Sequence, residues 1–285
     1  MHKISIQDIS LKGEWEIPPT EIFIEKKIGG GSFGTVFKGE WRGTDIAVKV
    51  VKNDVDTAEF DIEMDIISRL HHPNILQFLG ACTNVRPHMI VMEYMTNDTL
   101  ESANTFLSHT QRIGIVKDIA RGLAYLHNRK PECIIHRDLK PNNILLSTSF
   151  KAKIGDFGIS CIRASNDEAY NMTSETGTYR YMAPEVLMHK EYGAKVDIWS
   201  FGMILFFMFC RAPFGGMSVE QIVNEIVNYR GFDTVHGMCD RVRHVFSHCA
   251  LFDPSLRWNA LQVVQHCNTI PDFQPVKRKN VCCLA

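Results

Sequence analysis

The sequence predicts an α+β fold with a β-rich N-terminal lobe and an α-helical C-terminal lobe. Short apolar runs separated by glycine-rich turns extend from Ile22 to about Val51, a pattern typical of strands. From Leu100 onward the apolar spacing is helical, most clearly over Ile113–Asn128 and Val196–Cys210. Strands that precede helices, rather than alternating with them, indicate two packed lobes with a cleft between them.

Composition and charge exclude several classes of protein. The chain has 285 residues, enough for one large domain or two packed lobes. Its 31 Lys and Arg residues are balanced by 32 Asp and Glu residues, so no basic surplus favours a nucleic-acid partner. The 9 cysteines form no pair with metal-ligand spacing, which predicts reduced thiols in the cytosol or nucleus; of the two, we expect a cytoplasmic protein. The longest apolar stretch, Ile198–Cys210, is too short to span a bilayer, and the first residues show no signal-peptide pattern.

The first lobe is expected to contain one helix among its strands. Apolar residues recur at spacings of three and four within Thr57–Leu70, which predicts a helix there. Ile75–Leu79 and His88–Glu93 are again strand-like. The joint between the two lobes is expected at Glu93–Asn97.

A glycine-rich segment follows the first strand-like run. Gly29–Val36 has the pattern GxGxxGxV, and glycine lets a backbone approach phosphate oxygens because no Cβ stands in the way. Dinucleotide-binding folds carry a similar pattern before a helix, so a dinucleotide-dependent oxidoreductase is one alternative and an ordinary surface turn is another. Here the strand-like Thr35–Lys38 follows the glycines, which favours a hairpin that covers a nucleotide.

Lys49 ends the next apolar run and has a candidate partner. Glu63 lies inside the apolar stripe of the predicted helix, where a carboxylate is costly to bury unless it meets a cation. An ion pair between the two would hold the ammonium within reach of nucleotide phosphates. The alternative is a solvated lysine at a strand end and a glutamate at the edge of its stripe.

Two polar motifs in the second lobe have the groups needed for proton transfer and magnesium binding. Within His136–Asn143, Asp138 is placed to accept the proton of an attacking hydroxyl, and Asn143 offers an amide oxygen to a magnesium ion. A strand-like segment then leads to Asp-Phe-Gly at 156–158, where Asp156 supplies a charged magnesium ligand. Ala-Pro-Glu at 183–185 closes the polar segment that follows.

These motifs, in this order and at these distances, resemble the signature of the protein kinase family, and the resemblance covers Ile22 to about Thr269. It implies a small lobe with a five-stranded sheet and one helix, a larger helical lobe, and a protein substrate. ATP and Mg²⁺, with Mn²⁺ as an alternative ion, are implied between the lobes. We expect an N-terminal extension at 1–21, a kinase domain at 22–270 whose lobes span about 22–95 and 96–270, and a basic tail at 271–285.

The resemblance also assigns site residues. Met92 matches the gatekeeper position before the hinge at 93–95. ATP contacts are implied for Ile28, Gly29, Gly30, Gly31, Ser32, Phe33, Gly34, Thr35, Val36, Ala47, Lys49, Met92, Glu93, Met95 and Leu145. Catalytic roles are implied for Asp138, Lys140, Lys49, Glu63 and Thr178, and metal binding for Asn143 and Asp156.

Structural roles are implied as well. An apolar stack that links the lobes is implied for Ile67, Phe78, His136 and Phe157. Asp197 matches a buried aspartate that steadies the catalytic loop, and Glu185 is expected to pair with Arg257.

Within the family, the chain is similar to the tyrosine-kinase-like group, Raf type, through Trp15-Glu16-Ile17 and through longer runs at 37–43 and 74–80. Lys140 and Thr178 match serine/threonine kinases, with a dual-specificity kinase as the alternative. The complete set of catalytic residues disfavours a catalytically silent scaffold.

The chain also departs from the family pattern. Ala250 and Trp258 replace the usual Trp and Pro in the distal second lobe. His71 replaces an arginine that Raf enzymes use in side-by-side dimers, which leaves a dimer an open alternative.

Two features predict how the protein is controlled and located. Arg137 precedes the catalytic aspartate, and such an arginine is an unpaired charge until an anion arrives. We therefore expect phosphorylation of the following loop at Thr173, Ser174 or Thr176, with carboxylates such as Glu175 as the alternative anion. Cys282 stands in a CaaX-like box after a short basic run, which predicts prenylation and peripheral membrane contact. The alternative is an ordinary tail.

Overall fold

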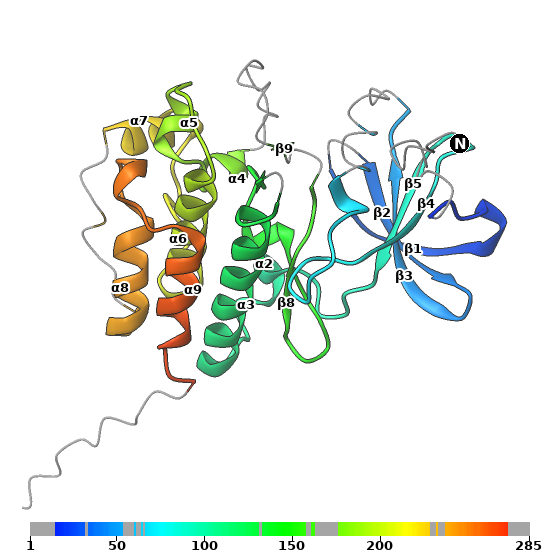
Figure 1. The fold of residues 1–285 in the computed structure, drawn as a ribbon, viewed down its shortest axis with the longest axis horizontal. Coiled ribbons are helices and arrows are strands. Elements are labelled where there is room, and N and C mark those ends of the chain that lie inside the picture. The colour runs from blue at the N-terminus through cyan, green and yellow to red at the C-terminus, as the bar shows by residue number, and fades with distance from the viewer. Residues whose placement is uncertain are drawn as a thin grey trace, which may run out of the picture.

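The computed structural model describes residues 15–31, 34–53, 60, 64, 66–130, 133–157, 161–162, 176–228, 232 and 237–272. Figure 1 shows the described strands of the first lobe gathered at one end of the molecule and the helices at the other. The α+β fold with a β-rich lobe and a helical lobe is therefore confirmed.

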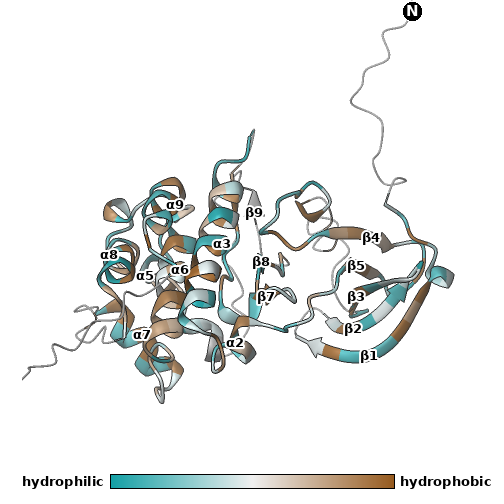
Figure 2. Cartoon of the chain, turned by 90° about the horizontal axis from the view of Figure 1, so that it is seen from below, coloured by the Kyte–Doolittle hydropathy of each residue, from teal (hydrophilic) through white to brown (hydrophobic). Residues whose placement is uncertain are grey.

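The first lobe is built on one antiparallel sheet. Its five strands lie in the order β1-β2-β3-β5-β4. They are β1 (Ile22–Gly30), β2 (Gly34–Trp41), β3 (Thr44–Val51), β4 (Phe78–Cys82) and β5 (Met89–Glu93). β3 lies at the centre, and its residues Ile46–Val48 are fully or almost fully buried, which explains why its sequence is a continuous apolar run. β1 is an edge strand, and hydrophobic and hydrophilic residues both occur along it (Figure 2).

The fourth strand begins later than the sequence predicts. We expected a strand over Ile75–Leu79, but β4 starts at Phe78. Ile75 instead forms an isolated bridge with Ile154 of the second lobe, and the backbone N–H of Leu76 donates to the carbonyl of Ile154 at 2.9 Å. The backbone of the apolar residues just before Phe78 is therefore hydrogen-bonded to the helical lobe and not to the sheet.

The N-terminal segment extends the sheet at its other edge. Glu16 and Ala81 form a parallel bridge, and the N–H of Ile17 donates to the carbonyl of Ala81 at 2.8 Å. A Cβ at Gly80 would lie 2.6 Å from the backbone carbonyl oxygen of Trp15, so only glycine lets this segment lie against β4.

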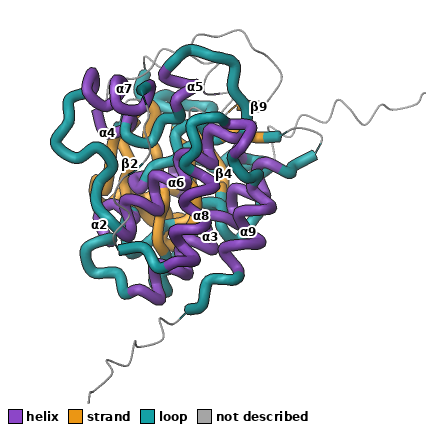
Figure 3. Tube along the Cα trace, turned by 90° about the vertical axis from the view of Figure 1, so that its left-hand side faces the viewer, coloured by secondary structure: helices purple, strands orange, loops and turns teal. Residues whose placement is uncertain are grey.

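The second lobe is a group of helices with short strands beside the cleft. The helices are α2 (Leu100–Ala103), α3 (His109–His127), α4 (Thr176–Tyr179), α5 (Pro184–Leu187), α6 (Lys195–Phe209), α7 (Val219–Val227), α8 (Asp240–Cys249) and α9 (Ala260–Asn268). The short strands are β6 (Ile134–Ile135), β7 (Ile144–Leu146), β8 (Ala152–Ile154) and β9 (Cys161–Ile162), which pair as β6 with β9 and β7 with β8. Figure 3, seen from the helical end, shows α3, α6, α8 and α9 with strands behind them.

Local sequence fixes where the longer helices begin. α3 starts with a capping box in which Ser108 and Gln111 bond each other's backbone N–H, and α7 and α9 begin in the same way. α6 is apolar around its whole circumference, and Trp199 and Phe201 are fully buried in it, so it is the central helix of the lobe. Among the described residues, no helix is both long enough and apolar enough to cross a membrane.

The two residues that depart from the family pattern in this lobe, Ala250 and Trp258, both pack with its hydrophobic core. Ala250 is 4% exposed and lies beside Gly202 of α6, where an added Cβ would come within 3.5 Å of the Ala250 side chain. Trp258 is stacked between His248 and His266, with ring centroids 4.1 and 4.0 Å away. An aromatic stack therefore fills the place of the usual proline.

Candidate active site

A cleft of about 910 Å³ lies between the sheet and the helical lobe. Of the residues with predicted ATP contacts, it is lined by Ile28, Gly29, Gly30, Gly31, Gly34, Val36, Ala47, Lys49, Met92, Glu93, Met95 and Leu145. Ser32 and Phe33 lie outside the described residues. Thr35 does not line the cleft, because successive residues of a strand face opposite sides and Val36 faces inward.

The glycine-rich segment includes the end of β1 and the start of β2, which pair antiparallel up to Gly30 and Thr35. The N–H of Gly31 donates to the carbonyl of Gly34 at 2.9 Å. A Cβ at Gly34 would lie 2.4 Å from the carbonyl oxygen of Val50, so no side chain fits there. A Cβ at Gly31 would meet no atom of the described residues within 4 Å, which leaves space beside the backbone in this wall of the cleft.

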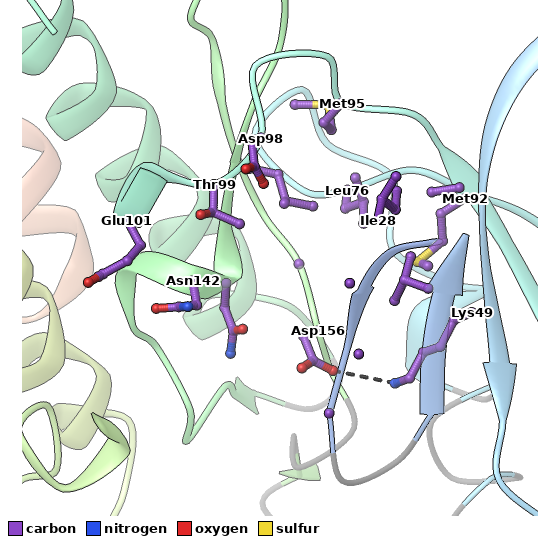
Figure 4. A pocket seen from close by; sticks show the side chains of 18 of the residues that line it. Ile28, Lys49, Leu76, Met92, Met95, Asp98, Thr99, Glu101, Asn142 and Asp156 are labelled. Atoms are coloured by element: carbon purple, nitrogen blue, oxygen red, sulfur yellow. Dashed lines mark hydrogen bonds and ion pairs between the residues drawn. The ribbon is translucent and has the colours of Figure 1, made fainter. Parts of the chain in front are cut away.

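Lys49 and Asp156 face each other across the cleft (Figure 4). The Nζ atom of Lys49 lies 3.4 Å from Oδ1 of Asp156. Burial alone would raise the pKa of Asp156, but the positive charges of Lys49, His136 and Lys140 outweigh it and lower the pKa below its usual value, so this carboxylate is ionised at neutral pH. Glu63, the predicted partner of Lys49, lies outside the described residues.

The backbone of Asp156 is held in an unfavourable conformation. Its φ is 58°, a left-handed value that costs a non-glycine residue about 1–3 kcal/mol. The neighbouring Gly155 is fixed on both sides, because its N–H donates to the carbonyl of Asn143 at 2.9 Å and its carbonyl lies 2.9 Å from Nε2 of His136. These contacts hold the turn that presents the carboxylate to the cleft.

Asp138 lies at the base of the cleft and is 8% exposed. Its Oδ2 atom lies 2.9 Å from Nζ of Lys140 and accepts a hydrogen bond from the Asn143 amide at 3.0 Å. Its Oδ1 atom is buried and has no hydrogen-bond partner in the part of the chain that the structure describes. A buried acceptor without a donor is costly, so this oxygen is suited to a donor that arrives with a substrate.

Burial also sets the acidity of Asp138. It raises the pKa of this carboxyl above its usual value, and the negative charge of Asp156 adds to the effect, whereas Lys140 and His136 oppose it. A raised pKa strengthens a carboxylate as a proton acceptor. Lys140 extends the site further, since its Nζ also donates to Oγ1 of Thr178 at 3.0 Å.

The loop that carries Asp138 is anchored by Asp197, as the resemblance implies. This residue is fully buried and accepts hydrogen bonds from the backbone N–H groups of His136 at 2.8 Å and Arg137 at 2.9 Å. Burial would raise the pKa of Asp197, but the hydrogen bond and charge of His127, 2.8 Å away, with contributions from His136, lower it. An ionised carboxylate thus fixes the loop that carries Asp138.

The other expected structural residues are also buried. Ile67, Phe78, His136 and Phe157 are each at most 8% exposed, and the rings of His136 and Phe157 lie 5.1 Å apart. Glu185 and Arg257 form a two-armed ion pair with distances of 2.6 and 2.8 Å. Both pairings join segments that are far apart in the sequence.

The structure adds cleft residues that the sequence reasoning missed. On the helical side, the lining includes Leu76, Asp98, Thr99, Glu101, Ser102, Asn142, Arg180 and Tyr181, and Figure 4 shows Asp98, Thr99, Glu101 and Asn142 along that rim. The polar run Thr96–Thr99 directly after the predicted hinge was a signal for Asp98 and Thr99. Arg180 and Tyr181 carried no such signal, because they reach the cleft only through the packing of α4 against the lobe.

Most of the predicted modification sites fall outside the described part of the chain. Thr173, Ser174 and Cys282 lie outside the described residues. Thr176 is the first residue of α4, and only its backbone is described.

Comparison with known proteins agrees with this arrangement. The family described as "Protein kinase domain" matches residues 23–267. The serine/threonine-protein kinase VIK of Arabidopsis thaliana is 38% identical over 283 residues, which cover 94% of this chain and 64% of VIK. The probable serine/threonine-protein kinase drkD of Dictyostelium discoideum is 39% identical over 75% of this chain and 17% of its own length. The serine/threonine-protein kinase CTR1 of Arabidopsis thaliana is 38% identical over 76% of this chain and 28% of its own length.

This chain therefore spans less than two thirds of the length of each of these three relatives. The family match, in contrast, extends over nearly all of the described sheet and helices. From its motifs, its two-lobed fold and this match, we conclude that the chain belongs to the protein kinase family.

Proposed function

We propose that this protein is an ATP-dependent serine/threonine kinase, which transfers the γ-phosphoryl group of ATP to hydroxyl groups of proteins. The observation that carries the proposal is the Oδ1 atom of Asp138, which has no hydrogen-bond partner among the described residues and lies at the base of a cleft that also contains Lys49 and Asp156. The names of similar proteins support it, because VIK and CTR1 are named serine/threonine-protein kinases and drkD a probable serine/threonine-protein kinase.

The adenine ring is proposed to lie between apolar side chains of the two lobes. Val36 and Ala47 line the cleft from the sheet, and Leu145 lines it from the helical lobe. Backbone groups of Glu93 and Met95, where β5 ends, are the proposed partners of the ring edge. An apolar slot with a few backbone polar groups is the usual environment of a planar ligand.

Asp156 and Asn143 are proposed to hold the metal ion that accompanies the phosphates. The donor set fits, because Asp156 is ionised and the amide nitrogen of Asn143 donates to the carbonyl of Asp138 at 2.7 Å and to its carboxylate at 3.0 Å. The amide oxygen of Asn143 is thereby left for a cation, and such oxygen ligands suit Mg²⁺ and Mn²⁺. Magnesium, when bound, would offset the charge of the phosphates.

The acceptor hydroxyl is proposed to donate its hydrogen bond to Oδ1 of Asp138 as it approaches the γ-phosphate. Lys49 orients the phosphates, and Lys140, fixed by Thr178, offsets negative charge near the transferred group. Positioning and electrostatic stabilisation supply most of the rate in this type of reaction. Glu63 is proposed as the carboxylate that orients Lys49.

The decisive experiment is a phosphotransfer assay with purified protein. Labelled ATP and magnesium are incubated with peptides that differ only in carrying Ser, Thr or Tyr as the acceptor. We expect labelled phosphoserine and phosphothreonine. Labelled phosphotyrosine in addition would favour a dual-specificity kinase, a name given to the relative shkA of Dictyostelium discoideum, which is 36% identical. ATP binding without transfer to any peptide would contradict the proposal and favour a scaffold.

Control by phosphorylation of the loop between 158 and 176 is part of the proposal. The Nε atom of Arg137 is buried and has no hydrogen-bond partner among the described residues, which suits an arriving phosphate. Thr173, Ser174 and Thr176 are the proposed acceptors. Phosphopeptide mapping of active protein tests this, and a loop without any modification in fully active protein would contradict it.

We propose a cytoplasmic protein that contacts membranes through a prenyl group on Cys282. The support comes from the sequence, in which the CaaX-like ending follows three cations at 277–279. Intact-mass measurement of protein expressed in eukaryotic cells tests the idea, since an unmodified Cys282 would rule out the anchor.

A further inference from the structure

An ion pair joins the last residue of β5 to the helical lobe. The Nζ atom of Lys153 in β8 lies 2.5 Å from Oε1 of Glu93, and the two side chains are only 19% and 27% exposed. The same oxygen accepts a hydrogen bond from the backbone N–H of Gln77 at 2.7 Å. Charge-assisted hydrogen bonds are stronger where solvent is largely excluded.

Gln77 belongs to a segment that is bonded to the helical lobe although it precedes a strand of the sheet. The N–H of Leu76 donates to the carbonyl of Ile154 at 2.9 Å, and the N–H of Ile154 donates to the carbonyl of Asn74 at 3.0 Å. The side-chain amide of Asn74 donates to the carbonyl of Ala152 at 3.0 Å. Residues 74–77 and β8 thus form one unit, and Lys153 is part of it.

Glu93 is attached to this unit by its side chain and by its backbone. Its carboxylate binds Lys153 and the N–H of Gln77, and its own N–H donates to the carbonyl of Gln77 at 3.1 Å. The end of β5 is therefore fastened to the helical lobe at the point where the chain leaves the sheet.

Strand register connects this attachment to the walls of the nucleotide cleft. Ala47, in the wall formed by the sheet, is paired with Met92, next to Glu93. Leu145, in the opposite wall, is paired with Lys153. The two partners of the ion pair therefore sit beside the two strands that face each other across the cleft.

We infer that the Glu93–Lys153 ion pair sets the separation of Ala47 and Leu145 and thereby the affinity of the cleft for the adenine ring. This inference rests on the proposed nucleotide-binding function and deepens it. Glu93 and Lys153 act in this respect as positioning residues, because the effect of their side chains reaches the ligand through the neighbouring strands. Breaking the pair should weaken adenine binding and leave the transfer step itself unchanged.

The test compares Lys153→Met with the wild-type protein. We expect KM for ATP and Kd for adenosine to rise together by about three- to tenfold, the effect of losing one net charge-assisted contact, with kcat and KM for the peptide unchanged. Adenosine is a useful probe because it has no phosphates and its binding requires no turnover. Lys153→Arg should restore both constants, and Lys151→Met, an exposed lysine of the same hairpin, should have no effect.

A double-mutant cycle shows whether the two side chains act together. Glu93→Gln keeps an oxygen for the N–H of Gln77 but removes the charge, so Glu93→Gln/Lys153→Met should be no weaker in adenosine binding than the weaker single variant. Folding of each variant is checked by its Tm. An unchanged Kd for adenosine in folded Lys153→Met would overturn the inference, and so would a raised kcat, because the pair would then restrain catalysis. If adenosine binds as expected but no phosphate is transferred, the proposed kinase function fails and the positioning role stands.

Discussion

Asn143 donates two hydrogen bonds from one amide nitrogen to Asp138, one to the backbone carbonyl at 2.7 Å and one to the carboxylate at 3.0 Å. A proposed metal ligand thus orients the proposed proton acceptor. Lys140 contacts the same carboxylate oxygen. The second oxygen of Asp138, which has no hydrogen-bond partner among the described residues, is therefore the one proposed to meet a substrate.

Replacement of Asp138 by Asn tests its role as proton acceptor. An amide cannot take the proton, so kcat should fall by about 10²–10⁴-fold, whereas Kd for ATP should stay within about twofold because Asp138 does not contact the nucleotide in this proposal. Steady-state kinetics and direct ATP titration measure the two quantities. Asp240→Asn, at a carboxylate that is 95% exposed, is the matched control, and equal activity of both variants would remove Asp138 from the mechanism.

Thr178 is predicted to act through Lys140. Loss of the hydrogen bond between Oγ1 and the ammonium should lower kcat/KM for the peptide in Thr178→Ala by about 10- to 100-fold, the range for a bond to a charged group. Thr178→Ser keeps the hydroxyl and should retain most of the activity. If the serine variant loses as much as the alanine variant, the methyl group and not the hydrogen bond is what matters.

The pH dependence of activity should report the raised pKa of Asp138. Activity requires the ionised carboxylate, so kcat/KM should be full above this pKa and fall as pH decreases through it. Lys140 lowers the pKa of Asp138, so in Lys140→Met the acidic limb of the profile should move to higher pH. Lys140→Arg keeps the charge and should leave the limb in place. A limb at the same pH in both variants would mean that another group controls it.

The Glu185–Arg257 pair should be important for stability. Arg257 is 2% exposed and also donates to the carbonyls of Leu251, Lys195 and Phe252 at 2.6, 3.0 and 3.0 Å. Arg257→Met would leave the Glu185 carboxylate buried without its cation, which should cost about 3–5 kcal/mol in the free energy of unfolding. Urea denaturation measures this.

An exposed ion pair provides the comparison for that experiment. Lys117 and Asp272 lie 2.7 Å apart, but 61% of the Asp272 side chain is exposed. Asp272→Asn should therefore change the free energy of unfolding far less than Arg257→Met does, because solvent screens an exposed ion pair. Similar losses in the two variants would show that burial does not determine the contribution of these pairs.

The amino-acid sequence by itself determined the fold class and indicated which residues line the cleft. Strand-like periodicity occurs in the first third of the chain and helix-like periodicity in the rest, which indicated two lobes. Each period shows which side chains of an element lie on one face and can be buried together. Asp138, Asn143 and Asp156 could be singled out because they lie in short motifs, where a few adjacent residues fix the local backbone and the side chains together.

Tertiary structure alone decided the features that join distant segments. β4 begins at Phe78 because the backbone of Ile75 and Leu76 is hydrogen-bonded to Ile154. A local sequence pattern cannot predict a bonding partner that lies so far along the chain. Glu93 meets Lys153 for the same reason, since 60 residues separate them. Periodicity tells which face of an element is apolar, but the contacts between faces depend on how the elements pack, and that packing is a property of the whole chain.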